Sequence, residues 1–162
     1  MKSQGRIAIC VGECFRTAAD AAAAADALLS EGVHVVAVAS QDAAARMLCE
    51  LSPAVVVIDL GLAAGSPLAV ADLCSYRHPE ARVILVGCGG LMADGAIFGH
   101  VVNAAALVPG PVHPADMTSL IAFHAGRYLP PAAAGHAMPR RIAELSGPRL
   151  PSARQIDRAL AG

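Results

Sequence analysis

Apolar and polar positions alternate between two kinds of segment over the first 126 residues. Five short, continuously apolar runs have the pattern of buried strands: residues 6–11, 33–39, 54–59, 82–87 and 105–108. Five stretches with apolar residues at helical spacing predict helices: residues 17–30, 40–51, a segment beginning at 67, 93–102 and 114–126. Strands that are apolar on both faces must be covered on both faces. The alternation therefore predicts an α/β fold, a doubly wound five-stranded parallel sheet with five flanking helices.

Local signals place several helix ends. Ser40 and Ser66 each precede a helical stretch and are expected to cap it with their hydroxyl groups. Pro67 follows Ser66, at the first helical position, where its missing N–H costs nothing. Asn103 follows the stretch 93–102, where a residue with left-handed backbone is expected to end the helix.

The character of the chain changes after residue 127. Residues 128–162 contain five of the eleven prolines and only short helical pieces. This composition is typical of a linker or an extension. The sequence therefore predicts two parts, a domain over residues 1–127 and a Pro-rich C-terminal extension over residues 128–162.

The composition indicates which partners and which cellular compartment the protein is expected to have. Hydrophobic residues make up 56% of the chain, charged residues 15%, and the formal net charge is -1, which argues against nucleic-acid binding by this segment. No apolar stretch has the roughly 18 uninterrupted residues of a membrane span. The N-terminus lacks the pattern of a signal peptide. Five cysteines, an odd number without a Cys-x-x-Cys pair, are typical of reduced thiols, so we expect a cytoplasmic protein with no direct nucleic-acid or membrane partner.

One charged residue stands out among the predicted strands. The run "VVVID" over residues 55–59 is continuously apolar until it ends on Asp59. In open parallel sheets, functional groups gather at the carboxyl ends of the strands. Asp59 is therefore the first candidate for a functional site.

Two segments carry a resemblance to a known family. The segment "DLGLAAGSPLAVADLCSYRHPEARVILVGCG" (59–89) and the segment "ALVPGPVHPADM" (106–117) resemble the central and last parts of a response-regulator receiver (CheY-like) domain. The resemblance covers residues 5 to about 126 and is strongest with receivers of helix-turn-helix transcriptional regulators. It implies a flavodoxin-like sheet with strand order 2-1-3-4-5, and a role in two-component signal transduction and transcription regulation.

The resemblance also implies a phosphorylation site, of which this chain keeps only a part. Asp59 occupies the position of the phosphate acceptor, and Glu13 is the one acid available after the first strand. Gly87 stands at the position of a hydroxyl residue, and Gly110 at the position of a lysine. Pro111 follows, and in the family the bond before it is usually cis. With so few partners, Mg²⁺ binding by Asp59 and Glu13 is expected to be weak, and no other metal or cofactor is indicated.

These departures favour an atypical receiver that works without phosphorylation. The expected role is that of a protein-interaction or dimerisation module, and not that of an enzyme, because no nucleophile–base pair is evident. The expected homodimer surface consists of the helix 93–102, the strand 105–108 and the helix 114–126. Two alternatives stay open: weak, Mg²⁺-dependent phosphorylation of Asp59, or a small-molecule sensor with its pocket around Asp59, Gly87 and Gly110.

Overall fold

A computed structural model describes residues 5–87, 96–110 and 112–126, which belong to the first of two units of the chain, Met1–Pro130. Five parallel strands form one sheet: β1 (Arg6–Val11), β2 (Val33–Val38), β3 (Val55–Asp59), β4 (Arg82–Val86) and β5 (Ala104–Val108). Their order in the sheet is β2-β1-β3-β4-β5. This confirms the predicted fold class and the strand order that the resemblance implies.

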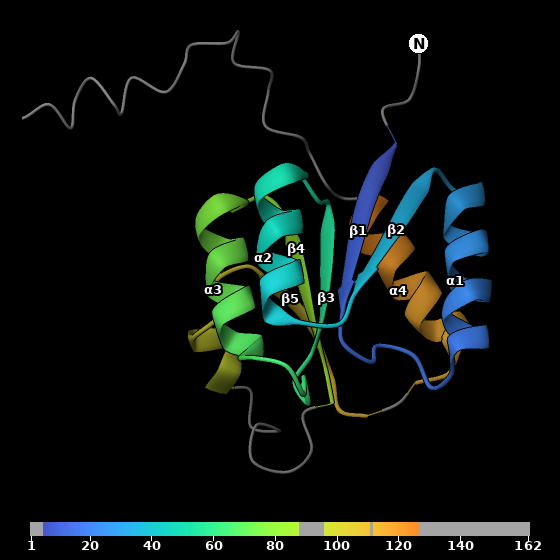
Figure 1. Ribbon diagram of the computed structural model, residues 1–162. Helices are drawn as coiled ribbons and strands as arrows, with labels where there is room; N and C mark the ends of the chain where they lie inside the picture. Colours follow the sequence, from blue (N-terminus) through green and yellow to red (C-terminus); the bar gives the residue numbers. More distant parts are fainter. Residues whose placement is uncertain (1–4, 88–95, 111, 127–162) are drawn as a thin grey trace, which may run out of the picture. The chain divides into compact units, whose positions relative to one another are not determined.

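Helices cover both faces of the sheet, as the apolar strands require. Four α-helices are described: α1 (Ala18–Ser30), α2 (Gln41–Glu50), α3 (Pro67–Arg77) and α4 (Pro114–Gly126). In Figure 1, α2 and α3 lie on one face and α1 and α4 on the other. Each face has its own core, with Ile9, Leu48 and Ile58 on the first and Leu28, Ile84 and Ile121 on the second. Of the helices in the described ranges, none has the length and apolar character needed to cross a membrane.

The predicted helix caps are confirmed. Ser40 Oγ accepts a hydrogen bond from the N–H of Ala43 (3.2 Å), and Ser66 Oγ accepts one from the N–H of Ala69 (3.3 Å). Pro67 is the first residue of α3. Each hydroxyl satisfies one of the N–H groups that the first helical turn leaves without a partner. Both caps therefore help to set where the helices begin after the strands β2 and β3.

The prediction of a helix over residues 93–102 is wrong for residues 96–102, the part of this segment that the structure describes. The chain forms only a short 3₁₀ helix, η1 (Ala96–Gly99), and residues 93–95 lie outside the described ranges. Of the two apolar pairs with helical spacing in this segment, Ile97 and Val101 are buried, while Phe98 and Val102 are exposed. A glycine at position 99 disfavours continued α-helix. Ile97 and Val101, four residues apart, are therefore both buried although the segment is not a regular α-helix.

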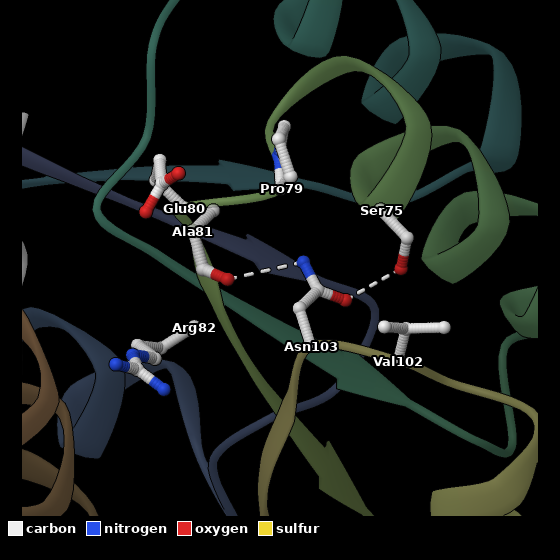
Figure 2. Close-up of a pocket in the computed structure, with 7 residues that line it drawn as sticks. All are labelled: Ser75, Pro79, Glu80, Ala81, Arg82, Val102 and Asn103. Atoms are coloured by element: carbon white, nitrogen blue, oxygen red, sulfur yellow. Dashed lines mark hydrogen bonds between the residues drawn. The ribbon is translucent and has the colours of Figure 1, made fainter. Parts of the chain in front are cut away.

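Asn103 does not have the left-handed backbone that the sequence pattern predicted, because no described residue other than glycine has a positive φ. Its side chain instead joins three segments, as Figure 2 shows in part. The Nδ2 group donates to the carbonyl oxygens of Ala81 (3.0 Å) and His78 (3.4 Å). The Oδ1 atom accepts a hydrogen bond from Ser75 Oγ (2.5 Å). Asn103 thus ties the end of α3 and the start of β4 to the start of β5.

Two sequence predictions fall outside the described residues. Pro111 is one of them, so the expected cis bond between Gly110 and Pro111 stays a prediction. The C-terminal extension over residues 128–162 is the other, and the division of the chain after residue 127 stays a prediction with it.

Candidate functional site

The residues that follow β1, β3 and β4 meet at Asp59. Residue 59 is the last of β3, the central strand, and its register partner on β4 is Val86. On the other side, β3 pairs with β1, which ends at Val11. The loops that follow β1, β3 and β5 gather at the lower edge of the sheet in Figure 1. Asp59 therefore lies at the carboxyl edge of the sheet, between the loops after β1 and β4.

Backbone N–H groups hold both oxygens of the Asp59 carboxylate. Oδ2 accepts a hydrogen bond from the N–H of Glu13 (3.1 Å), and Oδ1 accepts one from the N–H of Gly61 (2.8 Å). The side chain is half-buried. Hydrogen bonds from backbone N–H groups to an ionised carboxylate are stronger than those between neutral groups. The carboxylate therefore has a defined orientation without a cationic side chain.

Glycines surround this carboxylate. A Cβ atom at Gly12 would lie 2.9 Å from Asp59 Cβ, and one at Gly61 would lie 3.2 Å from Asp59 Oδ1. At Gly87 the corresponding distance to Asp59 Oδ1 is 3.4 Å. Gly12 also has a φ of 83°, a conformation that other residues adopt only with strain. The loops approach Asp59 through their backbone because these positions carry no side chains.

Glu13 reaches Asp59 through its backbone and not through its carboxylate. The hydrogen bond to Asp59 comes from the Glu13 N–H, and the Glu13 side chain is exposed. The residues on either side of it, Gly12 and Cys14, are not acids. Among the described residues, no group of three or more His, Cys, Asp or Glu side chains is placed to hold a metal ion. The described residues do not supply the donor set that the resemblance implies for Mg²⁺.

The structure places the other predicted positions at the same edge, with different relations to Asp59. Gly87 follows β4 and lies next to the carboxylate, and its N–H donates to the carbonyl of Val108 (2.9 Å). Gly110 follows β5, and a Cβ atom there would meet none of the described residues within 4 Å. Pro111 is not described. The structure thus brings Asp59, Glu13 and Gly87 together, and Gly110 has no side chain that could contact them.

Sequence reasoning missed the two cysteines beside this site. Cys14 is buried, and its Sγ lies 3.4 Å from the carbonyl oxygen of Val11 and 3.7 Å from that of Val57. A hydrogen bond with the Cys10 thiol, together with burial and the nearby negative charge of Asp59, raises the pKa of Cys14 far above its ordinary value. Cys14 therefore stays a neutral thiol at physiological pH, which makes it a poor nucleophile. Its position directly after Glu13 was the only sign in the sequence that it belongs to this loop.

Comparisons with known proteins identify the fold. No family model and no curated protein matches the sequence significantly. Among solved structures, a CheY-like receiver domain protein from Methanospirillum hungatei matches with a TM-score of 0.60 and 18% identity, over 75% of this chain and 94% of that one. The beryllofluoride-activated NtrC receiver domain matches with a TM-score of 0.60 and 20% identity, over 78% and 98% of the two chains. NtrX from Brucella abortus in complex with ATP matches with a TM-score of 0.58 and 21% identity, over 75% of this chain and only 27% of that one. The chain therefore has the fold of CheY-like receiver domains.

Proposed function

We propose that this chain is an atypical receiver that transmits a signal through protein contacts, without phosphorylation of Asp59. One observation carries the proposal: the carboxylate of Asp59 is held by two backbone N–H groups, while positions 12, 87 and 110 are glycines. The resemblance to receivers with a helix-turn-helix output leads us to include cytoplasmic two-component signalling and transcription regulation as the setting. No catalytic turnover is part of the proposal.

The reason is electrostatic. A phosphoryl group that is transferred to a carboxylate brings negative charge, and efficient sites stabilise this charge with fixed cations and hydrogen-bond donors. At Asp59 the described donors are the N–H groups of Glu13 and Gly61, which the carboxylate already uses. Neither Gly87 nor Gly110 offers a hydroxyl or an ammonium group. A phosphorylated Asp59 would therefore lack the side chains that make the modified state stable and distinct.

Phosphoryl labelling tests this proposal. The full-length protein and its Asp59→Asn variant are incubated with labelled acetyl phosphate and Mg²⁺, beside a receiver with a complete acid pair as a positive control. We expect the positive control to be labelled and the two forms of this protein to give the same background. Mg²⁺-dependent labelling of the parent protein that disappears in Asp59→Asn would establish weak phosphorylation, the alternative function, and would refute the proposal.

The surface for protein contacts is proposed to consist of η1, β5 and α4. β5 is an edge strand of the sheet, so one side of its backbone is not paired within the sheet. Phe98, Val102 and Phe123 belong to this part of the chain and are 43%, 89% and 55% exposed. We propose that these side chains form one apolar patch across the edge strand β5, because a contiguous exposed apolar patch favours an interaction surface. We propose a second copy of this chain as the partner, which makes the module a homodimer.

Light scattering with matched variants tests the dimer. Val102→Asp places a charge at the proposed surface, and Leu29→Asp places the same charge on α1, where Leu29 is 52% exposed. We expect the parent protein and Leu29→Asp to have the mass of a dimer and Val102→Asp that of a monomer, because an unpaired charge in an interface is costly. A monomeric parent protein, or a dimer that persists in Val102→Asp, would contradict the proposed surface. Addition of beryllofluoride with Mg²⁺ is expected to leave all masses unchanged.

A further inference from the structure

Two buried cysteines share a hydrogen bond at the carboxyl end of β1. Cys10 belongs to β1, and its register partner on β3 is Val57. Cys14 lies in the loop after β1, and its Sγ atom is 3.7 Å from the carbonyl oxygen of Val57. Both cysteines belong to the core on the face that α1 and α4 cover. Their two sulfur atoms therefore form a pair beside one residue of the central strand, the thiol pair.

A groove beside α1 gives access to the thiol pair. Its volume is about 520 Å³, its walls come from α1, from the loop after β1 and from the strands β1 and β2, and both cysteines line it. The groove follows from the composition of α1, since eight of the thirteen residues of this helix are alanines. Ala21 and Ala25 line the groove, and their methyl groups are too short to fill the space over Val35. A small ion can therefore reach the two sulfur atoms from the surface.

The number and the type of the donors determine which ion the thiol pair fits. Within the described part of the chain, no third His, Cys, Asp or Glu side chain joins the pair in a group placed to hold a metal. Structural zinc sites use four protein ligands, and Mg²⁺ and Ca²⁺ use oxygen ligands. Copper(I) prefers soft sulfur ligands and forms stable linear complexes with only two thiolates. The pair therefore fits copper(I) and does not fit the other three ions.

The separation of the sulfur atoms favours metal binding over a disulfide. Two metal–sulfur bonds of about 2.3 Å each place the sulfur atoms up to about 4.6 Å apart, whereas a disulfide needs them at about 2.05 Å. The separation of two hydrogen-bonded thiols is closer to the first value. Cys14 Sγ is also 3.4 Å from the carbonyl oxygen of Val11. An ion can thus replace the shared hydrogen bond with little movement of the loop.

The charge around the thiol pair favours a cation. The hydrogen bond with Cys10, burial and the negative charge of Asp59 raise the pKa of Cys14 far above its ordinary value. These causes oppose a free thiolate, because it would be a further negative charge in a buried place. A cation bound between the sulfur atoms offsets that charge, and a thiol that coordinates a metal gives up its proton outright.

We propose that Cys10 and Cys14 together bind one copper(I) ion. The ion arrives on a carrier with exchangeable ligands, such as a small thiol. The S–H bond of each cysteine breaks, both protons pass to water, two S–Cu bonds form, and the carrier ligands leave. Copper stays in the same oxidation state, so no oxidant or reductant takes part. This site is separate from the proposed dimer surface, and its existence does not depend on whether Asp59 accepts phosphate.

The position of the thiol pair connects it to Asp59. Cys14 directly follows Glu13, whose N–H donates to Asp59 Oδ2. The N–H of Gly12, in the same loop, donates to the carbonyl of Val38 at the end of β2 (2.8 Å). An ion that binds Cys14 therefore acts on the loop that orients the Asp59 carboxylate. The Glu13 amide is a natural reporter of binding.

Anaerobic titration of the reduced full-length protein tests the ion. Copper(I) is offered as its complex with bathocuproine disulfonate, a coloured chelator, and Zn²⁺ is offered in a separate titration with a zinc indicator. We expect the protein to take copper(I) from the chelator and to leave Zn²⁺ with the indicator. X-ray absorption at the copper edge should then show two sulfur neighbours. Failure to take copper(I), a copper shell of nitrogen or oxygen atoms, or transfer of Zn²⁺ from its indicator would overturn the proposal.

Substitutions of single cysteines test the location, with two matched controls. Cys49 is an exposed thiol, and Cys74 is a buried thiol in the core on the opposite face of the sheet. We expect Cys10→Ala and Cys14→Ala each to lose one bound copper(I) per chain, and Cys49→Ala and Cys74→Ala to bind as the parent protein does. Circular dichroism checks that each variant is folded. Binding that is unchanged in Cys14→Ala, or lost equally in Cys74→Ala, would overturn the assignment.

Two measurements on the parent protein complete the test without any substitution. In nuclear magnetic resonance spectra, copper(I) is expected to shift the Glu13 amide signal and to leave the Asn103 signals in place, and the reverse would contradict the site. Light scattering is expected to give the same mass with and without copper(I), because both ligands come from one chain. An increase in mass on addition of copper(I) would indicate an ion shared between copies and would also overturn the proposal.

Discussion

Replacement of Gly12 by alanine tests how the loop after β1 is built around Asp59. Gly12 has a φ of 83°, and a Cβ atom at this position would lie 2.9 Å from Asp59 Cβ and 3.2 Å from Leu62 Cδ1. Two separate costs are therefore expected. One is the strain of a left-handed backbone, and the other is the crowding of Asp59 and Leu62, which are fixed by β3 and by the core.

Gly32 provides a matched control for the first cost. Its φ is 78°, but a Cβ atom at Gly32 would meet no atom of the described part of the chain within 4 Å. For Gly32→Ala we expect a loss of about 1–2 kcal/mol from backbone strain alone. For Gly12→Ala we expect that loss plus about 1–3 kcal/mol for crowding. The smaller conformational freedom of alanine in the unfolded chain affects both variants alike and cancels in the comparison.

Urea unfolding, followed by circular dichroism, measures the free energy of unfolding of both variants and of the parent protein. A third variant, Gly12→Ala combined with Asp59→Ala, removes the nearest carboxylate and is expected to recover part of the crowding cost. Equal losses in Gly12→Ala and Gly32→Ala would refute the view that the loop approaches Asp59 too closely for a side chain. The same reasoning predicts a larger loss for Gly12→Asp, because aspartate at position 12 meets the same two costs and adds a like charge beside Asp59.

Three further predictions concern the fold around the site. Asn103→Ala should lower the free energy of unfolding by about 1–3 kcal/mol, because the carbonyl groups of the turn before β4 lose their donor; an unchanged urea midpoint would contradict this. Ser66→Ala should cost about 1 kcal/mol and Ser66→Gly only a few tenths, since glycine is tolerated at a helix N-cap; equal losses in urea unfolding would count against a capping role. Burial, partly opposed by a hydrogen bond from Asn103, raises the pKa of Cys74 to about 11 from an ordinary value of 9.0. The unfolded chain then loses this proton at a lower pH than the folded protein, so Cys74 contributes stability that is full below pH 9.0 and is lost as the pH rises towards about 11. Urea unfolding between pH 8 and pH 11 should show this decline, and the decline should be smaller in Cys74→Ala.

Much of the fold could be read from the chain because its signals are local. Continuously apolar strands require helices on both faces, and this requirement alone indicates a doubly wound sheet. Ser40 and Ser66 marked helix starts correctly because a cap depends on residues within one turn. The region around Asn103 was read less well. The apolar pairs Ile97/Val101 and Phe98/Val102 have the same spacing, so the sequence could not show that only the first pair is buried, and it could not distinguish a helix from a short 3₁₀ turn.

The candidate site was only partly predictable. Asp59 could be located because strand ends are visible in the sequence and functional groups gather there. The resemblance added the hydroxyl residue and the lysine that are expected beside Asp59. The residue types at positions 87 and 110, both glycine, showed that neither group is supplied there. The role of Glu13 could not be foreseen, because its contribution to Asp59 is a backbone N–H, which every residue except proline possesses.

By itself, the sequence determined the order of strands and helices, the place of the carboxylate, and the absence of a hydroxyl and a lysine at the positions of Gly87 and Gly110. These properties depend on residue type and on short-range periodicity. Only the tertiary structure decided that Glu13 turns its backbone to Asp59, that Asn103 joins α3, β4 and β5, and that the alanines of α1 leave a cavity over β2. The reason is that each of these features arises between segments far apart in the chain, where the distance between two elements is set by the largest side chains packed between them.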